Sequence, residues 1–126
     1  MIVGIGTDIV AVARMASGIE KYGERFASRI LSSNEFEVFS GHANQAHYLA
    51  KRFAAKEAVV KALGCGFRDG ISMRQVEVSN DPLGKPQVTL HSKAAERAKS
   101  MDVTEILLSL SDEREYAVAY VMAQKC

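Results

Sequence analysis

The sequence predicts an α+β fold, in which an antiparallel sheet packs with a long central helix and several shorter helices. One β-branched run opens the chain, helical periodicity fills the rest of the first half, and short alternating runs dominate the second half. Because strands and helices cluster separately, antiparallel pairing is favoured over alternating parallel βαβ units. No repeat and no linker rich in proline, glycine or serine divides the chain, so we expect residues 1–126 to form a single domain.

The first half is predicted to hold one strand and four helices. In the strand Ile2–Asp8, Gly4, Gly6 and Asp8 share one face, and glycines there indicate that another backbone or a ligand comes close. We expect Ser33 to cap the third helix and Gly64 to end the fourth. Helical spacing of apolar residues predicts these helices at about 9–22, 25–31, 35–39 and 46–63.

The second half is predicted to hold two hairpins separated by a helix at 92–101. Alternating apolar and polar residues indicate strands at 76–79 and 87–90, joined by a turn at 81–84. The second hairpin is expected to pair strands 105–111 and 116–122 through a charged turn at 112–114.

Composition excludes several classes of function. Among 126 residues, 16 Lys and Arg stand against 15 Asp and Glu, which gives a net charge of +1. A charge this small excludes a general polyanion binder, so we expect no nucleic-acid partner. No apolar run approaches a membrane span, and the start of the chain lacks the features of a secretion signal. With only Cys65 and Cys126, no disulfide framework is indicated, and we expect a cytoplasmic protein without a membrane partner.

Three familiar kinds of site are not supported. His42, His47 and His91 share no ligand spacing with one another or with a cysteine, which argues against a zinc site. Cys65 has no sequence partner that would make it a nucleophile, so a partly buried structural thiol is favoured. Neither G-x-x-x-x-G-K-S/T nor G-x-G-x-x-G is present, so the glycines near the N-terminus belong to a strand rather than to a phosphate loop.

The long helix and the residues after it carry one acid, Glu57, among several bases, which suggests a positive surface suited to a phosphate-rich ligand. Glu57 and Lys61 lie one turn apart on the same face. They form either a surface ion pair worth about 0.2–0.5 kcal/mol, or a site where Glu57 holds a divalent cation and Lys61 meets the phosphate. Magnesium suits the second interpretation. The bases are Lys51, Arg52, Lys56, Lys61 and Arg68.

Two further features allow two interpretations each. Asp8, on the glycine-lined strand face, is either a second carboxylate for the cation or an N-cap for the helix that follows. The run Gly64-Cys65-Gly66 either ends the long helix or offers backbone N–H groups to a pyrophosphate.

Four segments together carry a family resemblance. They are GIGTDIV leading into Arg14, RFAAKEAVVKALGCG at 52–66, DPLGKP at 81–86 and SLSDEREYAVAYV at 109–121. In this order and spacing, the chain resembles the holo-acyl-carrier-protein synthases, the small bacterial 4′-phosphopantetheinyl transferases, over nearly its whole length. The resemblance implies an enzyme of fatty acid biosynthesis that moves phosphopantetheine from coenzyme A to a serine of apo-acyl carrier protein, releasing adenosine 3′,5′-bisphosphate.

The resemblance also implies roles for particular residues. Asp8 and Glu57 match the family's Mg²⁺ ligands, and Lys61 matches the residue that neutralises the pyrophosphate, so catalysis is assigned to Glu57 and Lys61. Either Glu57 or a metal-held water takes the serine proton, and the sequence does not choose between them. The residues expected to contact coenzyme A are Arg52, Lys61, Gly64, Gly66, Lys85 and Pro86.

The acidic carrier protein implied by the family suggests a role for the first helices. Arg14, Lys21, Arg25 and Arg29 lie near one face if the helix is continuous or nearly so. They form either a solvated charged face or a docking surface for the carrier, which the resemblance favours. Many members have a histidine where this chain has Asp112, so we assign no ligand contact to Asp112.

The family is built as a homotrimer with active sites between neighbouring subunits, and larger relatives carry two such halves in one chain. A chain of 126 residues corresponds to one half, so we expect a homotrimer.

Two other functions are compatible with the same residues. One is a magnesium-dependent phosphohydrolase that uses Asp8, Glu57 and Lys61 to cleave a nucleotide pyrophosphate with water as the acceptor. The other is a binding module for the carrier protein or coenzyme A that keeps the fold without turnover.

Overall fold

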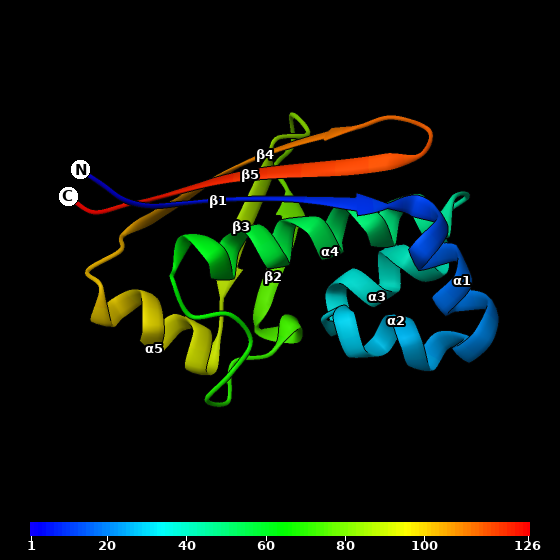
Figure 1. The fold of residues 1–126 in the computed structure, drawn as a ribbon, viewed down its shortest axis with the longest axis horizontal. Helices are drawn as coiled ribbons and strands as arrows, with labels where there is room; N and C mark the ends of the chain where they lie inside the picture. The colour runs from blue at the N-terminus through cyan, green and yellow to red at the C-terminus, as the bar shows by residue number, and fades with distance from the viewer.

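Strand β1 (Ile2–Ala11) runs along the long helix α4 (Gln45–Ala62), and the other elements are arranged around this pair (Figure 1). The computed structural model describes residues 1–126. β1 pairs with β5 (Tyr116–Gln124), and β5 pairs with β4 (Glu105–Asp112). The result is a three-stranded antiparallel sheet with the order β1-β5-β4.

A second sheet consists of the antiparallel hairpin β2 (Val76–Asn80) and β3 (Pro86–Leu90). β3 contacts β4, but the two sheets are not joined by a ladder of hydrogen bonds. The predicted antiparallel hairpins are therefore confirmed, although the strands form two sheets instead of one.

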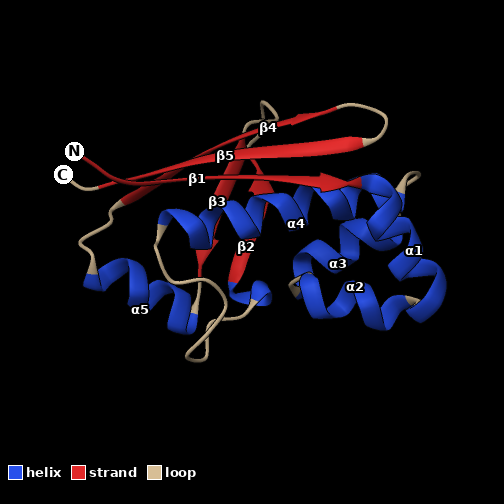
Figure 2. Ribbon diagram, viewed as in Figure 1, coloured by secondary structure: helices blue, strands red, loops and turns tan.

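All the helices lie on one side of the three-stranded sheet, and its opposite face has no helical cover (Figure 2). α4 packs directly against β1 and β5, as expected for the central helix of an α+β fold. None of the helices is both long enough and apolar enough to cross a membrane. The shorter helices are α1 (Val12–Tyr22), α2 (Glu24–Ile30), α3 (Ser33–Ser40), α5 (Ser92–Ser100) and a 3₁₀ turn at Met73–Gln75.

The predicted start of the first helix near residue 9 was wrong. β1 continues to Ala11, because Ile9 pairs with Val118 in the sheet, and α1 begins only at Val12. The apolar residues of this stretch satisfy both a strand and a helix pattern, and pairing with β5 decides between them.

The cap of α3 is Ser32 rather than Ser33. The Ser32 hydroxyl accepts a hydrogen bond from the Glu35 backbone N–H at 3.3 Å, and the Glu35 carboxylate accepts one from the Ser32 backbone N–H at 2.8 Å. This reciprocal pair is a capping box, and it requires the acid three residues after the cap. The spacing that was one residue off from Ser33 is correct from Ser32.

A buried ion pair joins α3, α4 and the start of β2. The Lys56 side chain is 0% exposed, and its Nζ lies 2.7 Å from Oε1 of Glu35. The same Nζ donates to the carbonyls of Met73 and Val76 at 2.9 and 2.6 Å, and Oε2 of Glu35 accepts from the Val78 N–H at 2.7 Å. Lys56 was expected to contribute to a positive surface, and this expectation was wrong because its charge is neutralised inside the core.

β1 approaches α4 so closely that two of its residues have no room for a side chain. A Cβ on Gly4 would lie 1.9 Å from the carbonyl oxygen of Ala62, and a Cβ on Gly6 would lie 1.9 Å from that of Ala58. The close neighbour that the glycines predicted is therefore the backbone of α4. Since side chains alternate along a strand, Asp8 is the next residue to face this helix.

Candidate functional site

Asp8 and Lys61 form an ion pair between β1 and α4. Lys61 Nζ lies 3.1 Å from Asp8 Oδ1 and donates to the Thr7 carbonyl at 3.0 Å. The Asp8 side chain is 16% exposed and that of Lys61 is 51% exposed, so solvent reaches the pair from the lysine side. Asp8 does not cap α1, whose N-cap is Ala11 without a side-chain hydrogen bond.

Glu57 is the second carboxylate of this cluster. Burial, together with the nearby charge of Asp8, raises the pKa of Glu57, and the positive charges of Lys61 and Arg14 oppose this shift. Lys61 pairs with Asp8 rather than with Glu57, so the structure does not contain the simple i,i+4 surface ion pair. The guanidinium of Arg14 lies 4.9 Å from the centre of the Phe53 ring, which holds it on this side of the helix.

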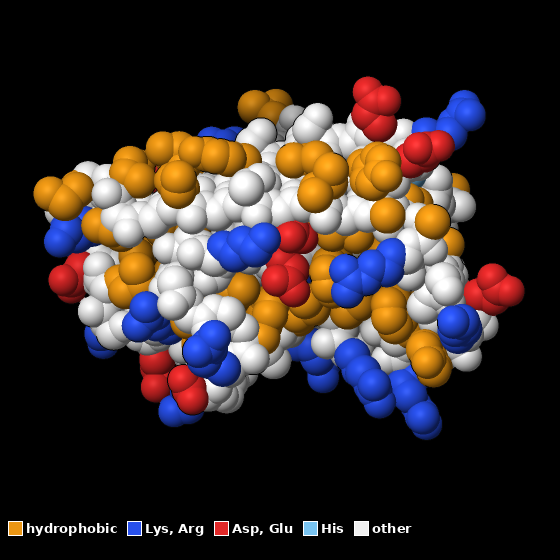
Figure 3. All heavy atoms as spheres, viewed as in Figure 1, with side chains coloured by type: hydrophobic (Ala, Val, Ile, Leu, Met, Phe, Trp, Pro, Cys, Tyr) orange, Lys and Arg blue, Asp and Glu red, His pale blue; other side chains and the backbone are white.

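The donors in this cluster fit a magnesium ion. No group of three or more His, Cys, Asp or Glu side chains is assembled in the molecule, so no all-protein metal cage exists. Mg²⁺ uses one or two carboxylates, with water and substrate phosphate oxygens as the remaining ligands. Asp8 and Glu57 supply two carboxylates whose mutual repulsion a cation would relieve. Figure 3 shows acidic side chains near the middle of this face, with basic side chains on either side.

Arg52 lies on a different side of α4, in a buried position. It is 6% exposed, its Nη2 donates to Oδ1 of Asn80 at 3.0 Å, and its guanidinium lies 4.7 Å from the centre of the Tyr48 ring. Its Nε is buried without a hydrogen-bond partner. Arg52 also borders a cavity of about 360 Å³. The cavity is lined by Val38, His42, Tyr48, Lys51, Arg52, Asn80, Gly84, Pro86, Leu110 and Asp112.

The helix separates Arg52 from Lys61, although both were expected to contact coenzyme A. At 3.6 residues and 5.4 Å per turn, nine residues correspond to about two and a half turns, so the two side chains point in opposite directions about 13 Å apart along the axis. Lys61 faces β1, and Arg52 faces the β2–β3 hairpin through Asn80. Within one chain, the carboxylate cluster and the Arg52 cavity therefore open on different sides of α4.

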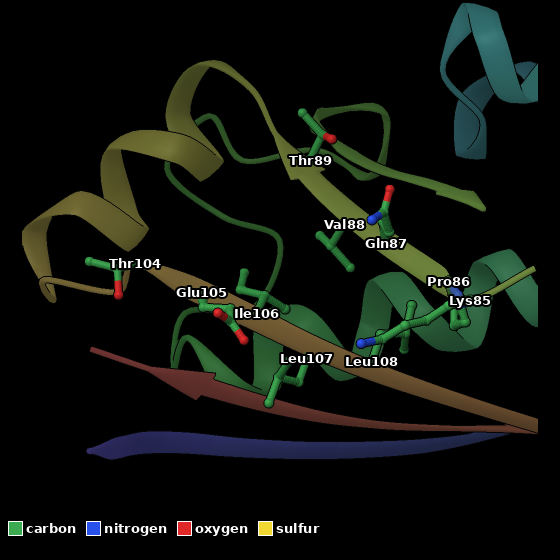
Figure 4. Close-up of a pocket in the computed structure, with 10 residues that line it drawn as sticks. All are labelled: Lys85, Pro86, Gln87, Val88, Thr89, Thr104, Glu105, Ile106, Leu107 and Leu108. Atoms are coloured by element: carbon green, nitrogen blue, oxygen red, sulfur yellow. The ribbon is translucent and has the colours of Figure 1, made fainter. Parts of the chain in front are cut away.

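Lys85 and Pro86, also expected near coenzyme A, follow the turn of the β2–β3 hairpin. Pro86 lines the Arg52 cavity, and both residues lie at one end of a groove of about 530 Å³ between β3 and β4. Figure 4 shows this groove running from Lys85 and Pro86 toward Thr104. The groove is lined by residues 85–89 of one sheet and 104–108 of the other.

Gly64 directly follows Leu63, the C-cap of α4, as the first of the two interpretations proposed, and Gly66 lies two residues further on. Both have positive φ, 68° and 67°, which favours glycine. The N–H groups of Gly64 and Cys65 bond to the carbonyls of Lys61 and Val60, at 3.1 and 3.2 Å. Only the N–H of Gly66 remains available to an anion from this run.

The basic row of the first helices is split into two parts. Gly23, with φ 61° and ψ −143°, separates α1 from α2, which confirms the two predicted helices but means that the four residues do not lie on one continuous helix. Figure 3 shows basic side chains projecting from the edge of the molecule where α2 lies. All four residues are exposed, Arg14 and Lys21 on α1, Arg25 and Arg29 on α2.

Sequence reasoning missed Tyr48 and Asn80, which hold Arg52 in place. Tyr48 precedes Arg52 by one helical turn, so an aromatic–arginine pair at i,i+4 was available as a signal. Asn80 directly precedes the DPLGKP segment, but its contact with a residue 28 positions earlier leaves no local pattern.

Comparison with known proteins identifies the family of this chain. The family model of the 4′-phosphopantetheinyl transferase superfamily matches residues 4–121. Holo-[acyl-carrier-protein] synthase of Halorhodospira halophila is 56% identical over 122 residues, which cover 97% of each chain. The chain belongs to the holo-acyl-carrier-protein synthase family. It is accordingly an enzyme of the phosphopantetheinyl transferase class.

Solved structures of family members have the same fold. The crystal structure of the synthase from Neisseria meningitidis superposes with a TM-score of 0.93 at 41% identity, covering 99% of this chain and all of its own. The synthase from Bacillus anthracis, solved in complex with CoA (3′,5′-ADP), has a TM-score of 0.81 at 37% identity, with 100% and 99% coverage.

Proposed function

We propose that this enzyme transfers the 4′-phosphopantetheine group of coenzyme A to a serine of apo-acyl carrier protein in a magnesium-dependent reaction that releases adenosine 3′,5′-bisphosphate. The observation that carries the proposal is the cluster of Asp8, Glu57 and Lys61, which combines two metal-type carboxylates with a solvent-accessible ammonium. A cytoplasmic location and a role in fatty acid biosynthesis complete the proposal and rest on the family.

Phosphoryl transfer requires mainly positioning and charge stabilisation from the protein. Asp8 and Glu57 would hold Mg²⁺, which supplies Lewis-acid neutralisation of the pyrophosphate oxygens. The Lys61 ammonium is half exposed, so it is able to turn from Asp8 toward a phosphate oxygen of the leaving group. Glu57, with its raised pKa, is suited to accept the serine proton directly, and a metal-held water is the alternative acceptor.

We assign the nucleotide end of coenzyme A to the Arg52 cavity. An adenosine bisphosphate carries several anionic oxygens, and the Arg52 guanidinium, the adjacent Lys51 and His42 offer donors to them. Pro86 supplies apolar surface at the same cavity. The complex of the Bacillus anthracis relative with CoA (3′,5′-ADP) supports a nucleotide ligand. Lys85 and the Gly66 N–H are proposed as further contacts.

Because the Arg52 cavity and the Lys61 cluster open on different sides of α4, we propose that each active site combines the two from neighbouring subunits of a homotrimer. The face of the three-stranded sheet without helices supplies the contact surface. This face exposes four large apolar side chains, Ile5, Ile9, Tyr116 and Tyr120. Exposed apolar patches of this kind are typical of protein–protein interfaces. Figure 3 shows hydrophobic side chains gathered along the β1 edge.

Docking of the acidic carrier is assigned to the basic residues of α1 and α2. Arg14 lies beside Glu57, so a carrier bound there would present its serine to the reacting phosphate. Lys21, Arg25 and Arg29 extend the positive surface from this point, and they act mainly on the association rate.

Intact-mass spectrometry of apo-acyl carrier protein incubated with the enzyme, coenzyme A and Mg²⁺ tests the reaction. We expect the carrier to gain the phosphopantetheine mass, and the gain to disappear with EDTA. Consumption of coenzyme A with an unmodified carrier would indicate the phosphohydrolase, and neither change would indicate the binding module.

Subunit complementation tests the shared site. Arg52→Ala and Glu57→Gln subunits, each inactive alone, are unfolded together and refolded as mixed trimers. If each site takes Glu57 from one subunit and Arg52 from its neighbour, about a quarter of the sites are intact after random mixing. Activity no higher than that of the separate variants would show that both residues act within one chain.

A further inference from the structure

Asp112 places a negative charge in the cavity that we assign to the phosphate-bearing end of the coenzyme. It ends β4 and lines the cavity with Lys51, Arg52 and His42. Its side chain is 37% exposed, so its charge is only partly screened by water. A carboxylate among phosphate-binding groups weakens anion binding unless its charge is neutralised.

His47 lies next to this carboxylate. It belongs to the first turn of α4, where its backbone N–H donates to the Asn44 cap at 3.2 Å. Its Nε2 lies 2.8 Å from Oδ2 of Asp112, with the histidine side chain 17% exposed. The distance suits an ion pair with a protonated ring, but no well-aligned hydrogen bond forms, and Nε2 has no other partner. The contact joins residues 65 positions apart, on α4 and β4.

We propose that His47 is a positioning residue for coenzyme binding, which holds Asp112 at the cavity wall and cancels its charge while the imidazole is protonated. The inference rests on the proposed function of the Arg52 cavity. Histidine side chains titrate near neutral pH. When the imidazole is neutral, Asp112 is an uncompensated negative charge, so the affinity for the coenzyme phosphate is lower than with the charged ring.

Other charges around the pair do not reproduce this dependence. Lysine, arginine and carboxylate side chains ordinarily change charge far outside the range from pH 6 to 8.5. His42 is the second titratable ring at the cavity, and it requires its own variant as a control. The charged groups of the surrounding elements are Lys51 and Arg52 on α4, His42 before it, Glu113, Arg114 and Glu115 in the β4–β5 turn, and Asp81 and Lys85 in the hairpin.

The test compares the KM for coenzyme A from pH 6 to 8.5 in the wild-type enzyme and in Asp112→Asn. The coenzyme's own phosphate titrates in the same way in both assays. The KM of the wild-type enzyme divided by that of Asp112→Asn therefore isolates the effect of Asp112. We expect the ratio to rise about fivefold across this range, with kcat changed much less. When the same ratio is measured in the His47→Gln background, the rise with pH should disappear. In the His42→Gln background it should persist. Asp102→Asn, an exposed residue with φ 59° that asparagine tolerates, is the matched charge control.

Dephospho-coenzyme A separates the two proposals. If the wild-type enzyme binds it as tightly as coenzyme A, the assignment of the cavity fails, whatever the pH dependence. If coenzyme A binds more tightly but the KM ratio is flat with pH, the cavity assignment stands and the role of His47 is overturned. A flat KM ratio would also be found if Asp112 only stabilises the N-terminus of α4. In that case Asp112→Asn changes the thermal stability and leaves KM unchanged.

Discussion

The two sides of α4 carry similar residues and use them in opposite ways. On the side of the β2–β3 hairpin, Lys56 is 0% exposed and three short contacts saturate its ammonium. On the side of β1, Lys61 is 51% exposed and pairs with Asp8. The charge of Asp8 in turn contributes to raising the pKa of Glu57. One lysine is fixed by the fold, and the other is free to change partners.

The difference shows what a charged helix face means in this molecule. Complete hydrogen bonding gives Lys56 a structural role, whereas the incomplete bonding around Lys61 is where we propose that a cation and a phosphate bind. Arg52 lies between these cases, because it is buried like Lys56 but retains one free donor. Variants on the two sides should therefore affect different measurements.

The largest loss of stability is expected for Lys56→Met. This change leaves Glu35 buried without its counter-ion, which costs about 3–5 kcal/mol. Urea denaturation followed by circular dichroism measures the loss. Lys61→Met is the matched control, since breaking an exposed pair costs at most about 1 kcal/mol. Equal destabilisation by the two variants would contradict the distinction between the two sides.

The largest loss of activity is expected for Glu57→Gln. Removal of one of the two proposed metal ligands should lower kcat/KM for carrier modification about 10³-fold, equivalent to several kcal/mol of charge stabilisation. Because the pKa of Glu57 is raised, its ionised form is disfavoured in the folded protein, so the neutral glutamine should leave stability unchanged or higher. Parallel assays of activity and thermal unfolding check both. Retained activity would remove Glu57 from the site.

Local patterns were sufficient for elements whose partners are close in sequence. The hairpins, the extent of α4 to within one residue at each end, and the glycine-lined strand face leading to Asp8 all came from short-range spacing. The i,i+4 relation placed Glu57 and Lys61 on one side of the helix before any fold was known. These features depend on geometry that repeats every two or four residues.

Features that depend on distant partners were not predictable in this way. Lys56 looks like its basic neighbours in sequence, and only Glu35, 21 residues earlier, determines that it is buried. The contact of His47 with Asp112 joins the start of α4 to the end of β4. No repeating pattern in the sequence relates these two positions.

A smaller effect, on the Lys61 side of α4, is expected for the double variant Arg14→Glu with Arg25→Glu. It should raise the KM for the acidic carrier about tenfold and the KM for coenzyme A much less, because long-range attraction acts on the carrier. Steady-state kinetics at low and high salt measure both constants. Lys93→Glu with Lys99→Glu, exposed on α5, is the matched control. Equal effects on both substrates would refute the docking surface.

The smallest effect is expected at Glu77 in β2, on the side of α4 that faces the β2–β3 hairpin. Its carboxylate accepts hydrogen bonds from the Ser32 hydroxyl at 2.7 Å and the Asn34 amide at 3.0 Å, and lies 3.1 Å from Nε2 of His91. The Ser32 bond contributes most to lowering the pKa of Glu77, and burial opposes it. Glu77→Gln should therefore cost about 1 kcal/mol at pH 6.

The pH dependence of this cost distinguishes a bonded carboxylate from a merely packed one. A pKa that is lower in the folded state stabilises the protein above the unfolded value, about 4.3 for glutamate, and this stability is lost as the pH falls through the folded pKa. The difference between the wild-type protein and Glu77→Gln should thus shrink between about pH 5 and pH 3. Urea denaturation at several pH values measures it, with Glu96→Gln, 67% exposed, as the control that should show no such trend. A difference that stayed constant with pH would mean that Glu77 contributes shape rather than charge.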